Sequence, residues 1–114
     1  MKKPSRHRLR QRTQALRRAI TTLDFIASGT LHTRTKVCGR PNCRCAVDPN
    51  ARHGPYHEWS RRHNQRLLHS VLTSEQAKLL TEAIANYRKI QQLLARWEQE
   101  TAKEILNPNG DADG

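Results

Sequence analysis

Three cysteines and one histidine are the residues of this chain best suited to bind a metal ion. Cys38, Cys43 and Cys45 fall within eight residues, His53 follows eight positions after the last of them, and the chain has no other cysteine. Thiolate and imidazole ligands together favour zinc, and a site with four protein ligands is the structural kind, without an open position for water. We therefore predict one Zn²⁺ per chain, held by these four side chains.

The spacing Cys-x4-Cys-x-Cys-x7-His is compatible with one tetrahedral site. Gly39 and Pro41 tighten the turn between the first two cysteines. Residues two apart lie on the same side of an extended segment, so Cys43 and Cys45 can both reach the metal. The arginines between the cysteines offset the negative charge of three thiolates. An iron–sulfur cluster is disfavoured, because it normally takes four cysteines.

The fourth ligand has several candidates. His53 is favoured because Gly54 and Pro55 turn the chain directly after it. His57 is the second choice. The weaker candidates, each expected to be an ordinary surface or strand residue, are His32, His63, His69 and Asp48.

Positive charge is concentrated in the first two thirds of the chain. The net charge is +11, and residues 1–72 carry sixteen Lys and Arg against three acidic residues, whereas residues 73–114 carry five against seven. Such a one-sided field favours a polyanionic partner, most commonly nucleic acid. The candidate nucleic-acid contacts are Arg6, Arg10, Arg12, Arg17, Arg18, Arg40, Arg44, Arg52, Arg61, Arg62 and Arg66.

The first 28 residues are expected to contain a basic disordered tail and a helix. Residues 1–8 are basic and include Pro4, which predicts the tail. Leu9, Leu16 and Leu23 are seven apart, which predicts an amphipathic helix over residues 9–28. Gly29 is expected to end this helix.

The middle of the chain, residues 30–72, is predicted to be a zinc-bound β unit. Three segments have the composition of strands, at residues 30–37, 56–61 and 66–72. Residues 62–65 form the turn between the last two, with Asn64 best suited to a left-handed conformation. Trp59, Leu67 and Val71 are expected to form a small apolar surface.

A second, long helix is predicted over residues 73–105. Thr73 and Gln76 match a capping box at its start. The acidic segment 106–114 is expected to be a disordered tail. A heptad pattern typical of a coiled coil favours self-association as a homodimer, and the alternative is that this stripe only packs against the first helix. Its positions are Leu80, Ala83, Tyr87, Ile90, Leu94 and Trp97.

These elements predict a single α+β domain, mostly α, in which two amphipathic helices flank a small antiparallel β-hairpin unit with a zinc knuckle. Only 35% of the residues are hydrophobic, so the core must be thin and a metal or a partner chain would help to stabilise it. An odd number of cysteines argues against disulfides, and no segment is apolar enough to span a membrane. We expect a reduced, cytoplasmic protein without membrane contact.

The motifs Cys38-Gly39-Arg40-Pro41-Asn42-Cys43-Arg44-Cys45 and His53-Gly54-Pro55-Tyr56 resemble those of a family of small uncharacterised prokaryotic proteins. Its members combine a Cys-Gly-x-Pro-x-Cys-x-Cys and His-Gly-Pro-Tyr core with a hairpin and a long C-terminal helix. The resemblance covers residues 28–100. It implies a metal site and a link to mobile genetic elements, but no established activity.

The leading functional hypothesis is a zinc-stabilised nucleic-acid-binding accessory or regulatory protein. Aromatic residues are few, at 4%, which favours backbone contacts with duplex DNA over stacking with single strands. The alternative is a protein–protein adaptor that uses the heptad-patterned second helix. An enzyme is not expected, because the sequence contains no paired carboxylates, phosphate-binding loop or Ser/His/Asp set at useful spacing.

Overall fold

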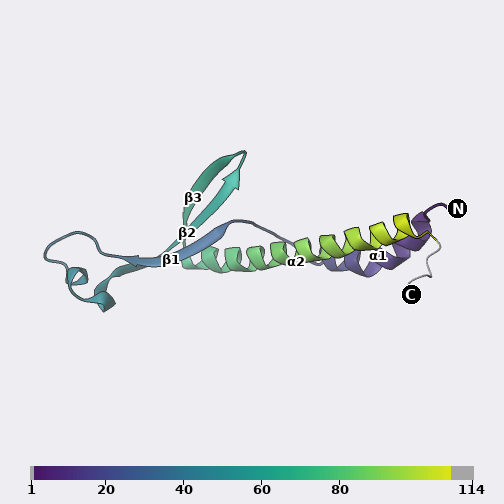
Figure 1. Ribbon diagram of the computed structural model, residues 1–114. Helices are drawn as coiled ribbons and strands as arrows, with labels where there is room; N and C mark the ends of the chain where they lie inside the picture. Colours follow the sequence, from purple (N-terminus) through teal and green to yellow (C-terminus); the bar gives the residue numbers. More distant parts are fainter. Residues whose placement is uncertain (1, 109–114) are drawn as a thin grey trace. The chain divides into compact units, whose positions relative to one another are not determined.

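A computed structural model of the protein describes residues 2–108, and the fold is α+β, with two helices and a three-stranded antiparallel sheet (Figure 1). Met1 and most of the tail predicted at residues 106–114, from Asn109 onwards, lie outside the described residues. The elements in chain order are α1 (Arg6–Thr21), β1 (Thr30–Lys36), the short 3₁₀ helices η1 (Arg44–Ala46) and η2 (Pro49–Ala51), β2 (His53–His63), β3 (Arg66–Leu72) and α2 (Ser74–Leu106).

The chain divides into two compact units. The sheet unit, Ala27–Ile84, holds the three strands, the cysteine loop and the first turns of α2. The helical unit consists of the residues before Ala27 and those from Ala85 onwards, so it holds α1 and the rest of α2. Neither helix in the described part of the chain combines the length and the apolar character that crossing a bilayer requires.

Helix α1 begins earlier and ends earlier than the predicted helix over residues 9–28. The Ser5 hydroxyl accepts a hydrogen bond from the Arg8 N–H at 3.1 Å and caps the helix, so the disordered tail predicted at residues 1–8 is wrong from Ser5 onwards. The helix ends at Thr21, and the Thr22 hydroxyl donates to the Ala19 carbonyl at 2.7 Å. Threonine hydroxyls that bond backbone carbonyls in this way compete with helix continuation.

Gly29 was predicted to end the first helix, and the structure gives it a different role. Its φ is +110°, and a β-carbon at this position would lie 2.4 Å from the Ser60 carbonyl oxygen and 2.8 Å from Trp59 Nε1. Trp59 Nε1 donates a hydrogen bond to the Ser28 carbonyl at 2.9 Å. Glycine is therefore required where the chain enters β1 against β2.

The sheet has the order β1-β2-β3, and its register decides which side chains share a face. Leu67 pairs with Arg62 and Val71 pairs with Glu58, whereas Trp59 pairs with Ser70. Because neighbouring residues in a strand point to opposite faces, Trp59 lies on the face opposite Leu67 and Val71. The single apolar surface predicted from these three residues is therefore wrong.

The β2–β3 hairpin turns over two residues rather than the predicted four. β2 runs through His63 and β3 begins at Arg66, which leaves Asn64 and Gln65 as the loop, with φ of 50° and 67°. Two consecutive positive φ angles are typical of a type I′ turn, whose twist matches that of the flanking strands. At its other end β2 starts at His53, not Tyr56, because His53 pairs with Lys36 of β1.

Helix α2 begins as predicted, with reciprocal hydrogen bonds between Thr73 and Gln76. The Gln76 N–H donates to Thr73 Oγ1 at 3.1 Å, and the Thr73 N–H donates to Gln76 Oε1 at 2.8 Å. Further along α2, the heptad residue Leu94 is 47% exposed within one chain, whereas the neighbouring Leu93 is 8% exposed. A straight helix drifts by about 20° per heptad, so a seven-residue repeat does not follow one buried face over this length.

In the helical unit, α1 and α2 run antiparallel. Near the end of α2, Glu104 binds Arg8 of α1, and near the beginning of this part of α2, Asn86 Nδ2 donates to the Phe25 carbonyl at 3.0 Å. The buried residues of this unit among those described are Thr13, Leu16, Leu93 and Glu104. Its interior is therefore small and partly polar.

Candidate metal centre

The loop between β1 and β2 brings the three cysteines and His53 together. One ligand atom from each of Cys38, Cys43, Cys45 and His53 lies within 4.8 Å of the other three. The Sγ atoms of Cys38 and Cys45 are 3.5 Å apart, and Cys43 Sγ is 3.3 Å from His53 Nε2. Among the described residues, no other group of three or more Cys, His, Asp or Glu side chains gathers in this way.

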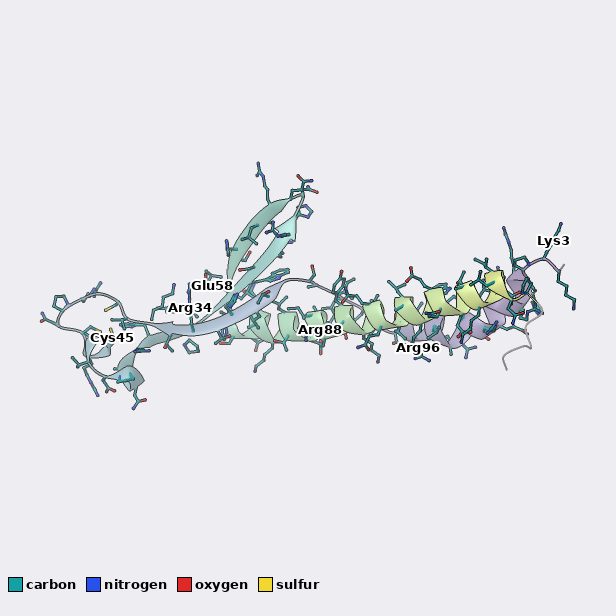
Figure 2. The ribbon with its side chains drawn as sticks, viewed as in Figure 1. Lys3, Arg34, Cys45, Glu58, Arg88 and Arg96 are labelled. Atoms are coloured by element: carbon teal, nitrogen blue, oxygen red, sulfur yellow. The ribbon has the colours of Figure 1, made fainter. Side chains whose placement is uncertain are left out.

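Short-range backbone structure positions the cysteines. The Cys43 N–H donates to the Arg40 carbonyl at 3.2 Å and closes a turn, and Gly39, with φ of +83°, directly precedes that turn. The Cys43 carbonyl then accepts from Ala46 at 3.0 Å, in the 3₁₀ helix η1 that carries the buried Cys45. The sequence motif therefore folds back on itself, and Figure 2 shows Cys45 inside this loop.

The β1–β2 ladder supplies the other half of the site. Lys36, the last residue of β1, pairs with His53, the first residue of β2. Cys38 lies two residues after Lys36, so the end of the ladder brings Cys38 and His53 to the same place. The Cys38 N–H also donates to Cys45 Sγ at 3.3 Å. The ligand set is thus held by a ladder end and a tight turn.

The spacing of the ligand atoms fits a tetrahedral metal ion. Zinc–sulfur bonds of about 2.3 Å and zinc–nitrogen bonds of about 2.0 Å imply tetrahedral edges of about 3.8 Å between sulfurs and about 3.5 Å between sulfur and nitrogen. The two contacts of 3.5 and 3.3 Å are slightly shorter than these edges, and the limit of 4.8 Å is longer. Shifts of about 1 Å would bring the four atoms into that geometry. The residues present therefore fit the metal that their chemistry favours.

The thiols perturb one another. The backbone N–H of Cys45 lowers the pKa of Cys43, and hydrogen bonds from the Cys45 and Cys38 side chains lower it further. The backbone N–H of Cys38 acts to lower the pKa of Cys45, but burial and the neighbouring Cys43 and Cys38 sulfurs outweigh it, so this pKa is raised. Ionisation of one thiol thus opposes ionisation of its neighbour. A bound cation would offset the repulsion between the thiolates.

The other candidate ligands have different roles. His57 Nδ1 lies 2.9 Å from Thr33 Oγ1, and its Nε2 lies 3.4 Å from Ser74 Oγ, so it links β1 and the start of α2. His69 Nδ1 lies 3.0 Å from Ser60 Oγ. Asp48 accepts from the Asn50 N–H at 3.0 Å and caps η2.

The predicted arginine contacts are divided between the two units, and several have intramolecular partners. Arg6, Arg10, Arg12, Arg17 and Arg18 lie in α1, and Arg40, Arg44, Arg52, Arg61, Arg62 and Arg66 lie in the sheet unit. Arg12 Nε forms an ion pair with Glu100 at 3.1 Å, Arg44 pairs with Asp48 at 3.1 Å, and Arg61 lies 4.6 Å from the centre of the Trp59 ring. Arg44 was expected to offset the thiolate charge, and this ion pair directs it to Asp48 instead.

A shallow depression in the sheet unit contains polar residues that sequence reasoning did not single out. They are Arg34, Glu58 and Ser60, which line it together with His32 and His69, two of the weaker ligand candidates, and Arg34 forms an ion pair with Glu58 (Figure 2). Alternation of side chains along β1 and β2 allows Arg34 and Glu58 to lie on the same face of the sheet. That they are close enough to pair depends on the register between the two strands, which the sequence does not give. Lys36 Nζ, next to the cysteine loop, lies 5.1 Å from the centre of the Tyr56 ring.

Residues 6–80 match the model of a protein family described as a domain of unknown function, DUF6788. The chain belongs to that family. The match covers α1, the sheet and the whole cysteine loop, and it ends within α2. No curated protein and no solved structure matches the chain. Membership of an uncharacterised family is thus confirmed, while the prokaryotic origin, the diagnostic motif and the link to mobile genetic elements stay predictions.

Proposed function

We propose that this member of the DUF6788 family is a zinc-stabilised nucleic-acid-binding protein with an accessory or regulatory role, and that duplex DNA is its preferred ligand. The observation that carries the proposal is the gathering of Cys38, Cys43, Cys45 and His53 in a loop that also exposes Arg40 and Arg52. A metal ion would fix this loop, and a fixed loop would present its guanidinium groups in one arrangement.

Zinc is the proposed metal because of the donor set. Three sulfurs and one imidazole nitrogen suit a soft, tetrahedral ion, and four protein ligands close the site. Native mass spectrometry of protein purified without chelators should show one zinc per chain. The ligands must be reduced to bind, which supports a reducing compartment such as the cytoplasm.

The arginines with exposed side chains around the loop and at the hairpin are the proposed phosphate contacts of the sheet unit. They are Arg40, Arg52, Arg62 and Arg66. Guanidinium groups bind phosphate oxygens in pairs, and such contacts position a protein on duplex DNA without reading its sequence. The net charge of +11 supports a polyanionic ligand over a neutral one.

The test of this function is duplex DNA binding by the metal-loaded and the metal-free protein. Fluorescence anisotropy with a labelled 20-base-pair duplex of random sequence should show binding that weakens steeply with salt and that is reduced when the metal is removed. Binding that does not change between about 50 and 200 mM salt would contradict a mechanism based on phosphate contacts.

The proposed function is binding rather than catalysis. In the site as we propose it, all four metal positions are occupied by the protein, so no position remains where a metal-bound water could be activated. The metal would stabilise the folded loop. The arginines of the loop would attract the phosphates of the nucleic acid.

An adaptor that binds another protein through α2 is the competing hypothesis. The exposure of Leu94 and Ile105, at 47% and 57%, favours it. Affinity purification before and after nuclease treatment separates the two hypotheses. Partners that survive nuclease and moderate salt would support the adaptor, and partners that are lost would support nucleic-acid binding.

A further inference from the structure

The part of α2 in the helical unit carries an uncovered apolar stripe. Leu94, Trp97, Thr101 and Ile105 recur at helical spacing, and together with Glu98 and Ala102 they line a shallow groove. Leu94 is 47% and Ile105 57% exposed. The stripe lies beyond residues 6–80, the part of the chain that matches the family model.

The stripe is uncovered because α1 packs against a neighbouring face of α2. Leu93 and Glu104 face the interior of the helical unit and are 8% and 1% exposed. Leu94 and Ile105 each follow one of these residues by one position, which places them about 100° further around the helix. Leu80 and Ala83, earlier in the heptad pattern, are buried in the sheet unit. The uncovered stripe therefore begins further along α2, at Leu94.

The helical unit needs more buried surface than two helices provide. Among its described residues only Thr13, Leu16, Leu93 and Glu104 are buried, and two of these are polar. Units with so small an interior usually depend on a metal, a disulfide or association with another chain. The cysteine–histidine cluster lies in the sheet unit, so we expect the helical unit to be stabilised by association with another chain.

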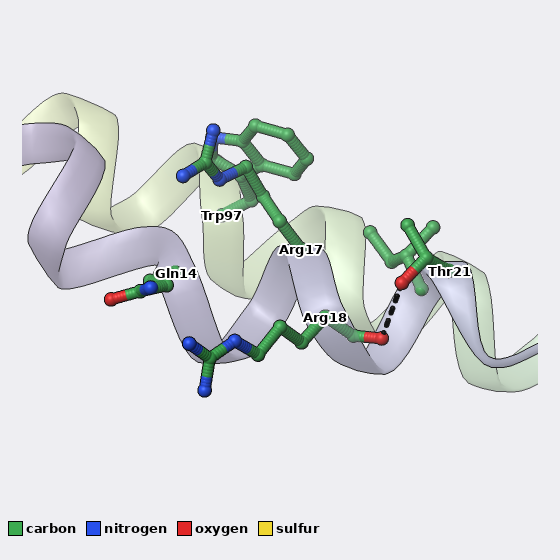
Figure 3. A pocket seen from close by; sticks show the side chains of 6 residues that line it. Gln14, Arg17, Arg18, Thr21 and Trp97 are labelled. Carbon is green, nitrogen blue, oxygen red and sulfur yellow. Dashed lines mark hydrogen bonds between the residues drawn. The ribbon is translucent and has the colours of Figure 1, made fainter.

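Charged residues on both sides of the stripe indicate what kind of partner it fits. Trp97 also lines a second depression, with Gln14, Arg17, Arg18, Ile20 and Thr21 (Figure 3). Glu98 lines the groove, Arg17 and Arg18 line the second depression, and Trp97 lines both. The Arg18 side chain is exposed, so its guanidinium group can donate to a carboxylate of another chain. A surface with both charges at one apolar stripe is complementary to itself.

We propose that a second copy of this chain covers the stripe. In a two-fold arrangement, Leu94, Trp97 and Ile105 of the two copies pack together, and Glu98 of each copy reaches the Arg17–Arg18 pair of the other. The contact turns each two-helix unit into half of a four-helix assembly. This inference does not depend on the proposed function of the metal centre.

Sedimentation velocity of the full-length, metal-loaded protein tests the dimer. The sample is treated with nuclease and kept in moderate salt, because nucleic acid could bridge two basic monomers. We expect a dimer at about 100 µM, and Leu94→Glu with Ile105→Glu should raise the dissociation constant by about tenfold or more. Both side chains are exposed, so helix content and metal content should stay at wild-type values.

Leu79→Glu is the matched control, because Leu79 is 57% exposed on the same helix but lies in the sheet unit. It should leave the dimer unchanged. A wild-type protein that sediments as a monomer, or a Leu94→Glu/Ile105→Glu variant that associates as tightly as wild type, would overturn the proposal. A wild-type monomer that copurifies with a different protein bound to the stripe would also overturn it.

A charge exchange tests the register of the contact. Glu98→Arg and Arg18→Glu should each weaken the dimer, and the two changes combined should restore part of the lost affinity, because the pair is then reversed across the interface. A combined variant that is weaker than both single variants would contradict the proposed pairing.

Discussion

Arg8 and Glu104 connect the first helix of the chain to the end of the second. Arg8 Nε donates to Glu104 Oε1 at 2.9 Å, and Arg8 Nη2 donates to Oε2 at 2.8 Å. The Ser5 N–H donates to Oε2 at 2.8 Å as well, so one carboxylate binds both the capping residue and the first turn of α1. Glu104 is 1% exposed, which leaves it dependent on these partners.

Glu104 should make the stability of the helical unit sensitive to acid. Hydrogen bonds from Arg8 and from the Ser5 N–H, with the charges of Arg8 and Arg12, lower the pKa of Glu104 from 4.5 to about 2 despite its burial. Because the pKa is lower in the folded protein, the stabilisation is complete above pH 4.5 and is lost as the pH falls from 4.5 towards 2. Thermal unfolding followed by circular dichroism across this range should show the loss.

Glu104→Gln is the matched variant for this measurement. It should unfold at a lower temperature than wild type at neutral pH, and the difference between the two should shrink as the pH falls towards 2, where wild-type Glu104 becomes protonated. Metal release in acid affects both proteins equally and cancels in the comparison. A constant difference across the range would contradict the assigned role.

Loss of one metal ligand should unfold the cysteine loop. Cys43→Ser should abolish binding of the metal, and His53→Ala should weaken it by tenfold or more, about 1.4 kcal/mol, because binding energy at such a site is folding energy. His57→Ala is the control, since His57 bonds Thr33 and Ser74 instead. Metal content and amide exchange of residues 37–53 report the outcome. Equal loss of metal in both histidine variants would contradict the assignment of His53.

The features that the sequence predicts well depend on neighbouring residues. The approach of Cys38, Cys43 and Cys45 to one another and the Thr73–Gln76 cap follow from spacings within one loop or turn. The choice between Leu93 and Leu94 as the buried residue could not be predicted, because it depends on which face of α2 the first helix covers. The role of Arg8 was missed because its partner is 96 residues away, and periodicity carries no information about such a pair.

Gln65 is a position where the sequence does not match the turn that it adopts. Its φ of 67° favours glycine, and the preceding Asn64 already suits a type I′ turn. Gln65→Gly should therefore stabilise the hairpin by about 0.5–1 kcal/mol, because removing the β-carbon relieves a left-handed conformation. Thermal unfolding of the metal-loaded protein measures the gain. Gln65→Val should have the opposite effect, and an equal or lower melting temperature for the glycine variant would contradict the turn assignment.

The arginines near the metal centre should contribute to the salt dependence of DNA binding. Removal of Arg40 and Arg52 together should reduce the slope of log K against log salt by about 2, since each phosphate contact contributes about 0.9. Removal of Arg6 and Arg10 tests the helical unit in the same way.

These point variants are preferable to deletion of residues 1–12, which would also remove Ser5, Arg8 and Arg12 from their contacts with α2. Arg12→Ala is the control, because Arg12 pairs with Glu100. An unchanged slope in both double variants would place the DNA contacts elsewhere in the chain.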